Sequence, residues 1–84
     1  MLEEVRGGIM QAYKDSDNNS NIVAYEIGDD LIVIKFCTGR FKSYKYTTRS
    51  TSSHNISEMK KLASLGDGLN SFISNNKPGY ESKW

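Results

Sequence analysis

The stretch LIVIKFCTGRFKSYKYT, residues 31–47, decides the expected fold. Its first part, LIVIKFC, is a nearly continuous apolar run rich in β-branched residues, which is typical of a buried strand. Its last part, RFKSYKYT, reads as a second strand in which aromatic and basic residues interleave. Thr38 and Gly39 between them can supply the positive φ that a tight turn needs. The stretch therefore predicts a central antiparallel hairpin over residues 31–46.

A two-residue turn at Thr38 and Gly39 would fix the pairing of the two strands. Residue 37 would then pair with residue 40, and residue 31 with residue 46. This register places Tyr44 and Tyr46 on one face together with Leu31 and Val33. It places on the other face Ile32, Ile34 and Phe36. A one-residue bulge would exchange the two faces.

The segments that flank the hairpin on its N-terminal side predict a strand and a helix. NIVAYEIGDD, residues 21–30, is rich in β-branched and aromatic residues and ends in a turn, so it predicts another strand. Apolar side chains recur at helical spacing near the start of the chain, and they predict an N-terminal helix over residues 2–14. These side chains are Leu2, Val5, Ile9, Met10 and Tyr13.

The C-terminal third predicts two helices. Asn55 with Glu58 three residues later fits a capping box, so a helix is expected to begin near Ile56 and to end at Gly66. Asp67 is expected to cap a second short helix, which Pro78 and Gly79 would close. Tyr80 and Trp84 follow in a tail for which a loose and a folded-back arrangement both stay open.

These elements predict one α+β domain over residues 1–84. A three-stranded antiparallel sheet would pack against the N-terminal helix and the two C-terminal helices. No run of residues approaches the roughly 18 apolar residues of a membrane span, and Glu3, Glu4 and Arg6 interrupt any signal-peptide core. Cys37 is the single cysteine, which suits the reducing cytoplasm. A cytoplasmic location without a membrane partner is therefore expected.

Charge is distributed unevenly along a chain whose net charge is +1. Acidic residues predominate in residues 1–30, whereas residues 31–57 contain no acidic residue. The cations of that basic segment are Lys35, Arg40, Lys42, Lys45 and Arg49. Such a cluster is typical of a surface for nucleic acid or an acidic partner, and also of a solvated sheet face.

Residues suited to catalysis or metal binding are scarce. His54 is the only histidine and follows a Ser/Thr-rich stretch, which favours an exposed loop residue over a general base. No second His or Cys stands at a metal-ligand spacing, so neither a metal nor a cofactor is expected. Cys37 reads as a small apolar residue at a strand end. The sequence therefore predicts a binding module rather than an enzyme.

The order of motifs over residues 20–76 resembles the KTSC domain family, a small domain of bacterial and phage proteins and of the C-terminus of some lysyl-tRNA synthetases. The similar positions are Ser20, Ile22, Tyr25 and Glu26, then Ile32, Ile34, Phe36 and Gly39, then Tyr44-Lys45-Tyr46, then Leu62, Ala63, Gly66, Leu69 and Ile73. The chain departs from the pattern in a longer interval between Gly39 and Tyr44, in lacking the Val-Pro after the paired tyrosines, and in residues 2–14. The resemblance implies a bacterial host cell and, from the attachment to synthetases, RNA binding.

We therefore expect binding of RNA or a nucleotide by a basic and aromatic strand face. Aromatic rings would stack on bases while cations meet phosphates. The residues expected to form this site are Lys35, Arg40, Phe41, Lys42, Tyr44, Lys45, Tyr46 and Arg49. Alternatively, Tyr44 and Tyr46 pack in the core, or they divide, with Tyr46 inside and Tyr44 near the rim.

Two other functions stay open at this point. The chain could be a phage-type protein-interaction module that inhibits a host or defence protein, for which its small size and acidic N-terminal third speak. It could also sequester a nucleotide signal in a pocket formed by a homodimer. Salt dependence of binding and the survival of a partner after nuclease treatment would separate these alternatives.

Overall fold

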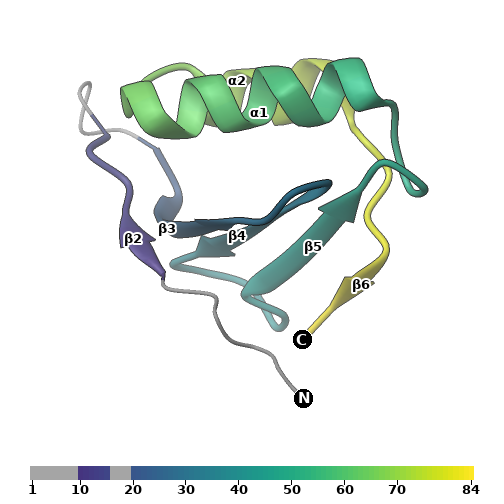
Figure 1. Ribbon diagram of the computed structural model, residues 1–84. Coiled ribbons are helices and arrows are strands. Elements are labelled where there is room, and N and C mark those ends of the chain that lie inside the picture. The colour runs from purple at the N-terminus through teal and green to yellow at the C-terminus, as the bar shows by residue number, and fades with distance from the viewer. Residues whose placement is uncertain (1–9, 16–19) are drawn as a thin grey trace.

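The computed structural model describes residues 10–15 and 20–84. In this part of the chain, two helices lie over an antiparallel sheet with the strand order β2-β3-β4-β5-β6 (Figure 1). The strands are β2 (Gln11–Ala12), β3 (Ile22–Ile27), β4 (Leu31–Phe36), β5 (Ser43–Thr47) and β6 (Ser82–Lys83). The helices are α1 (Ser53–Leu65) and α2 (Leu69–Asn76). The predicted α+β class is confirmed, but the sheet has more strands than the three expected.

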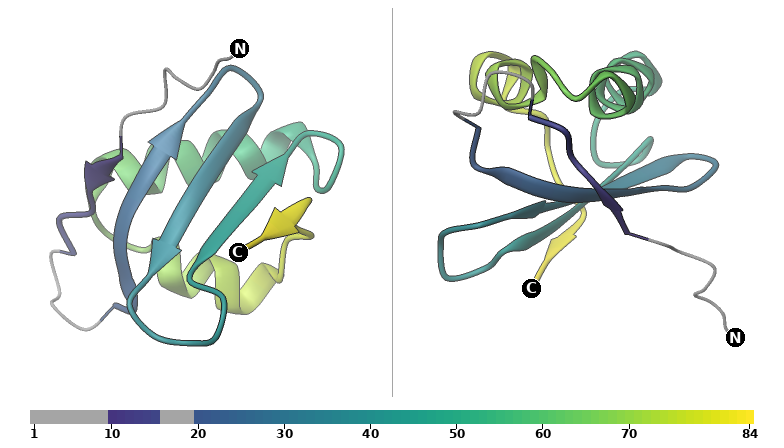
Figure 2. Two further views of the ribbon diagram at one scale, coloured as in Figure 1. Left: turned by 90° about the horizontal axis from the view of Figure 1, so that it is seen from below. Right: turned by 90° about the vertical axis from the view of Figure 1, so that its left-hand side faces the viewer.

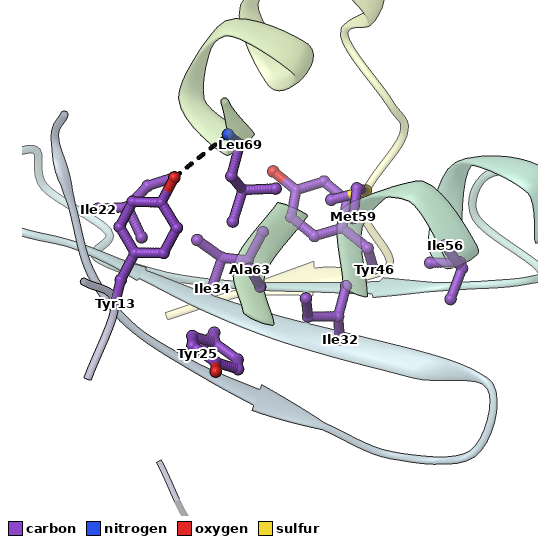
Figure 3. Packing of buried hydrophobic residues seen from close by; sticks show 10 residues of the cluster. All are labelled: Tyr13, Ile22, Tyr25, Ile32, Ile34, Tyr46, Ile56, Met59, Ala63 and Leu69. Atoms are coloured by element: carbon purple, nitrogen blue, oxygen red, sulfur yellow. Dashed lines mark hydrogen bonds between the residues drawn. The ribbon is translucent and has the colours of Figure 1, made fainter. Parts of the chain in front are cut away.

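Both helices cover the same face of the sheet, and the core lies between the two layers (Figure 2). Ile32 and Ile34 are fully buried because alternate residues of β4 point toward the helices. Met59 of α1 and Leu69 of α2 meet them from above (Figure 3). Burying an aliphatic side chain of this size contributes about 1.5–3 kcal/mol, so this layer supplies much of the stability of a small domain.

The predicted register of the central hairpin is wrong by one residue. Leu31 pairs with Thr47 and Ile32 pairs with Tyr46, so the tyrosines share the helix-covered face with Ile32 and Ile34. The cause is the connection: the Phe36 N–H donates to the Lys42 carbonyl at 2.7 Å, which leaves a five-residue loop instead of a two-residue turn. Because strand side chains alternate with a period of two, this shift exchanges the faces.

The predicted N-terminal helix is wrong where the structure describes it. Residues 11 and 12 form β2, which pairs with Tyr25 and Ala24 of β3, and residues 2–9 of the prediction lie outside the described residues. Tyr13 follows β2 and reaches the core. The apolar spacing therefore marked a core residue correctly, but two glycines at positions 7 and 8 already weakened a helix there.

The two C-terminal helices are confirmed, with different N-termini from those predicted. The Ser52 hydroxyl caps α1 by accepting the Asn55 N–H at 3.0 Å, three residues before the expected cap. Gly66 ends α1 in the left-handed conformation, as expected. Gly68, and not Asp67, precedes α2, and no side chain of its own caps that helix. No helix among the described residues is long and apolar enough to cross a bilayer.

Candidate functional site

One wall of a pocket comes from the end of β4, the loop after it, and β5. Phe36 is the last residue of β4, while Arg40 and Phe41 belong to the loop that follows. Tyr44 and Tyr46 stand two residues apart on β5, so they point to the same face. The chain thus brings four aromatic rings together at one end of the central hairpin.

The opposite wall comes from the end of α2 and the segment that follows it. Ile73 lies in the last turns of α2, and Lys77, Pro78, Gly79 and Tyr80 continue the wall. Together the two walls line an open pocket of about 620 Å³. We call it the aromatic pocket; its lining is Asn21, Phe36, Thr38, Gly39, Arg40, Phe41, Tyr44, Tyr46, Ile73, Lys77, Pro78, Gly79 and Tyr80.

Tyr44 is the centre of the aromatic cluster. Its ring meets Phe36 edge to face at 5.4 Å and Tyr80 edge to face at 5.0 Å between centroids. The Tyr46 ring is nearly parallel to it at 6.5 Å. Edge-to-face pairs at these distances are favourable because the positive ring edge meets a negative ring face. Tyr44 therefore links β4 and β5 to the segment after α2, and it fixes the two walls relative to each other.

The rim of the aromatic pocket is cationic. The Arg40 guanidinium lies 5.7 Å from the centroid of the Phe41 ring. The Lys83 ammonium lies 5.0 Å from the same ring and 5.2 Å from the Tyr80 ring. A side-chain hydrogen bond with Tyr80, and the electrostatic interaction with the same tyrosine, raise the pKa of Lys83 above the ordinary lysine value. Since none of the lining residues is acidic, the pocket suits an anionic ligand.

Tyr46 forms the buried end of the cluster. Only 3% of the residue is exposed, and burial, followed by the neighbouring Tyr44 and Tyr80, raises its pKa to about 12. Figure 3 shows its hydroxyl turned toward the helical layer. Within residues 10–15 and 20–84, this hydroxyl has no hydrogen-bond partner. A polar group buried in this way ordinarily has a partner, because losing its contact with water is costly.

The residues predicted for the site divide into two groups. Arg40, Phe41, Tyr44 and Tyr46 line the aromatic pocket. The other four do not line it: they are Lys35, Lys42, Lys45 and Arg49.

The cations outside the pocket have other surroundings. Lys35 and Lys45 stand at register positions of the face opposite the helices, because they alternate with Ile34 and Tyr46. Lys45 and Arg49 each lie 3.7 Å from a Glu81 carboxylate oxygen. The Thr47 hydroxyl also donates to this carboxylate at 2.9 Å. That hydrogen bond and the two cations hold the pKa of Glu81 below its usual value, against a smaller opposing effect of burial.

Sequence reasoning missed the wall that follows α2. Lys77, Pro78 and Tyr80 line the pocket, and Lys83 lies over its rim. The tail folds back as β6 beside β5, where Lys83 pairs with Tyr44. The only signal for this arrangement was the aromatic and basic content of residues 77–84, which resembles that of β5.

His54 and Cys37, the other reactive side chains considered from the sequence, lie in different parts of the described structure. His54 is exposed in the first turn of α1. Cys37 is exposed, and its thiol lies 2.8 Å from the Asn21 side-chain oxygen, to which it donates. In the part of the chain that the structure describes, no three His, Cys, Asp or Glu side chains gather as a metal site would require.

Comparison with known proteins found no relative of the chain. No protein-family model, no curated protein and no solved structure matches the chain. The resemblance to the KTSC domain therefore stays a prediction from the order of motifs in the sequence.

Proposed function

We propose that the chain is a non-catalytic module whose aromatic pocket binds a nucleotide, either on its own or as a unit of RNA. The observation that carries this proposal is the composition of the pocket: five aromatic rings, two cations and no acidic residue line one hollow. Bases stack on aromatic side chains, and phosphates pair with Arg and Lys. A nucleotide combines both requirements in one ligand.

The exposure of the rings suggests which of them would meet the base. Phe41 is 38% exposed and Tyr80 is 44% exposed, so both offer ring surface to a ligand. Tyr44 is half-buried between Phe36 and Tyr80 and holds the wall in place. Stacking of one base on an aromatic ring contributes about 1–3 kcal/mol. Arg40 and Lys77, which line the same hollow, would supply the phosphate contact.

The test is a calorimetric titration of the protein with nucleoside monophosphates and a short mixed-sequence RNA, at low and at moderate salt. Phosphate contacts make binding weaker as salt rises, so affinity should fall between the two conditions. Arg40→Gln should weaken binding about tenfold, because it removes a charge-assisted contact worth about 1.4 kcal/mol.

Lys35→Gln is the matched control, since Lys35 is an exposed cation of the neighbouring strand that does not line the pocket. It should leave the affinity unchanged. An equal loss of affinity in both variants would contradict binding in the aromatic pocket and would favour binding on the strand face expected from the sequence. Absence of binding to every nucleotide, together with a single host protein retained on the chain after nuclease treatment, would favour the protein-interaction alternative.

A further inference from the structure

Resting on the proposed function, we infer that the aromatic pocket takes one free nucleotide, with its phosphate at Lys77 and Arg40, and not a strand of RNA. The proposal joins four observations: the cations at the pocket, the size of the hollow, an unpartnered hydroxyl on a residue that lines it, and the backbone conformation of Lys77.

Three cations of the described residues lie at the aromatic pocket. Arg40 and Lys77 line the pocket, and Lys83 lies over its rim. Beyond the pocket, Lys45 on β5 and Arg49 after its end are both paired with Glu81, whereas Lys42, directly before β5, is exposed and does not line the pocket. Proteins that hold a single strand need a positively charged groove that follows several nucleotides. A local cluster beside one hollow suits a ligand with one phosphate group.

The size of the hollow agrees with a small ligand. Its volume of about 620 Å³ falls inside the range of roughly 300–1,000 Å³ that is typical of small-molecule sites. It also has the usual composition of such sites, mostly apolar and aromatic with a few polar groups that orient the ligand.

The Tyr46 hydroxyl could distinguish between ligands that carry a polar group on one edge and ligands that do not. The residue lines the pocket and is 3% exposed, and its hydroxyl lacks a partner within residues 10–15 and 20–84. A ligand that brings a carbonyl or amine to this hydroxyl would satisfy it, whereas a ligand without one would leave it unpaired. Nucleobases carry such groups along their edges.

Lys77 has a backbone conformation that favours glycine. It ends α2 with φ +47° and ψ +56° in the left-handed region, directly before Pro78. Gly or Asn is usual at this position of a helix end, and a residue before proline is normally extended. Side chains held in unfavourable backbone conformations cluster at binding sites. The unfavourable conformation of this lysine in the pocket wall supports a role for its charge in binding.

The experiment compares the full chain's affinity, by calorimetry over a series of salt concentrations, for 5′-AMP, 5′-GMP, 5′-CMP and 5′-UMP, for the four nucleosides, for inorganic phosphate, and for a mixed-sequence RNA decamer. We expect at least one monophosphate to bind as tightly as the decamer or more tightly, with a shallow salt dependence of similar slope. Nucleosides and phosphate alone should each bind at least tenfold more weakly than that monophosphate.

The outcomes separate this inference from the proposed function. A decamer that binds more than tenfold more tightly than every monophosphate, with a steeper salt dependence, would overturn the inference while supporting nucleotide recognition. If no probe binds, the proposed function itself fails. If inorganic phosphate binds as tightly as the best monophosphate, the inference that the pocket recognises the base is overturned.

Two variants test the assigned residues. Lys77→Gly should weaken monophosphate binding at least fivefold without lowering the melting temperature, because glycine accepts the left-handed conformation. Tyr46→Phe should weaken binding of the preferred base and reduce the difference between bases. Wild-type affinity in Lys77→Gly would overturn the phosphate site at Lys77, and unchanged base preference in Tyr46→Phe would overturn the role of the hydroxyl.

Discussion

Two buried tyrosines, Tyr13 and Tyr46, show how much the surroundings of a single hydroxyl differ within one core. The Tyr13 hydroxyl accepts the N–H of Leu69 at 3.3 Å, at the start of α2 (Figure 3). Gly68 caps this helix without a side-chain bond, so Tyr13 satisfies an N–H that would otherwise be unpaired. The Tyr46 hydroxyl, by contrast, has no hydrogen-bond partner in the part of the chain that the structure describes.

The two hydroxyls therefore have opposite expected contributions to stability. Tyr13→Phe should lower the free energy of unfolding by about 1–3 kcal/mol, because the buried Leu69 N–H loses its acceptor. Tyr46→Phe should leave the free energy unchanged or raise it, because it removes an unpaired polar group. Urea unfolding of the two variants measures the difference. A loss in Tyr46→Phe as large as that in Tyr13→Phe would show that the Tyr46 hydroxyl has a partner in the folded chain.

Sequence reasoning identified both tyrosines as candidates for the core but could not assign their hydroxyls. The apolar spacing of residues 2–14 marked Tyr13, although in the wrong kind of element. Its acceptor role depends on Leu69, which stands 56 residues further along the chain. A contact of that separation is decided by how the layers pack and leaves no trace in local periodicity.

Among the elements, the central hairpin shows what a strand pattern determines and what it does not. Alternation placed Tyr44 and Tyr46 on one face correctly, because residues two apart always share a face. Which face they share depends on the length of the loop between Phe36 and Lys42. The Thr-Gly pair fitted a tight turn, yet the five residues between these two positions form the connection. One residue of difference moved both rings under the helices.

Helix α1 offers a test of which residue caps it. Ser52→Ala should lower the free energy of unfolding by about 1 kcal/mol, because its hydroxyl accepts the Asn55 N–H. For a domain of this size, that corresponds to a fall of about 4–8 °C in melting temperature. Ser57→Ala changes an exposed residue of the same helix. It is the control, and it should change the melting temperature little. Equal melting temperatures in the two variants would contradict Ser52 as the cap.

At the scale of the whole molecule, the aromatic pocket combines two parts of the chain that are distant in sequence. Residues 36–46 form one wall and residues 73–80 form the other. The first wall was predicted in part, because its basic and aromatic residues are consecutive. The second could not be, because it depends on α2 and on the return of the tail to the edge of β5.

The second wall rests on a close approach between Gly79 and the turn before α1. The Ser50 hydroxyl donates to the Gly79 carbonyl at 2.9 Å, and a methyl group at Gly79 would collide with the Ser50 carbonyl oxygen. Gly79→Ala should therefore displace residues 77–80 and weaken nucleotide binding at least fivefold, as measured by calorimetry.

Gly68→Ala is the matched control for this change. Gly68 has a φ of +82°, so alanine there is strained by about 1 kcal/mol, but an added methyl would meet Leu62 at an ordinary distance and Gly68 does not line the pocket. This variant should melt earlier and keep the wild-type affinity. Equal losses of affinity in the two variants would mean that general destabilisation, and not the wall, explains the effect.

The return of the tail has a consequence for spectroscopy. Trp84 is the only tryptophan of the sequence, and its backbone exchanges hydrogen bonds with Ser43 and accepts the N–H of Lys42. Its indole is therefore an intrinsic fluorophore attached to the strand that carries Lys83 and follows Tyr80. Emission from this one side chain should therefore report, in the unlabelled protein, whether β6 is docked on β5.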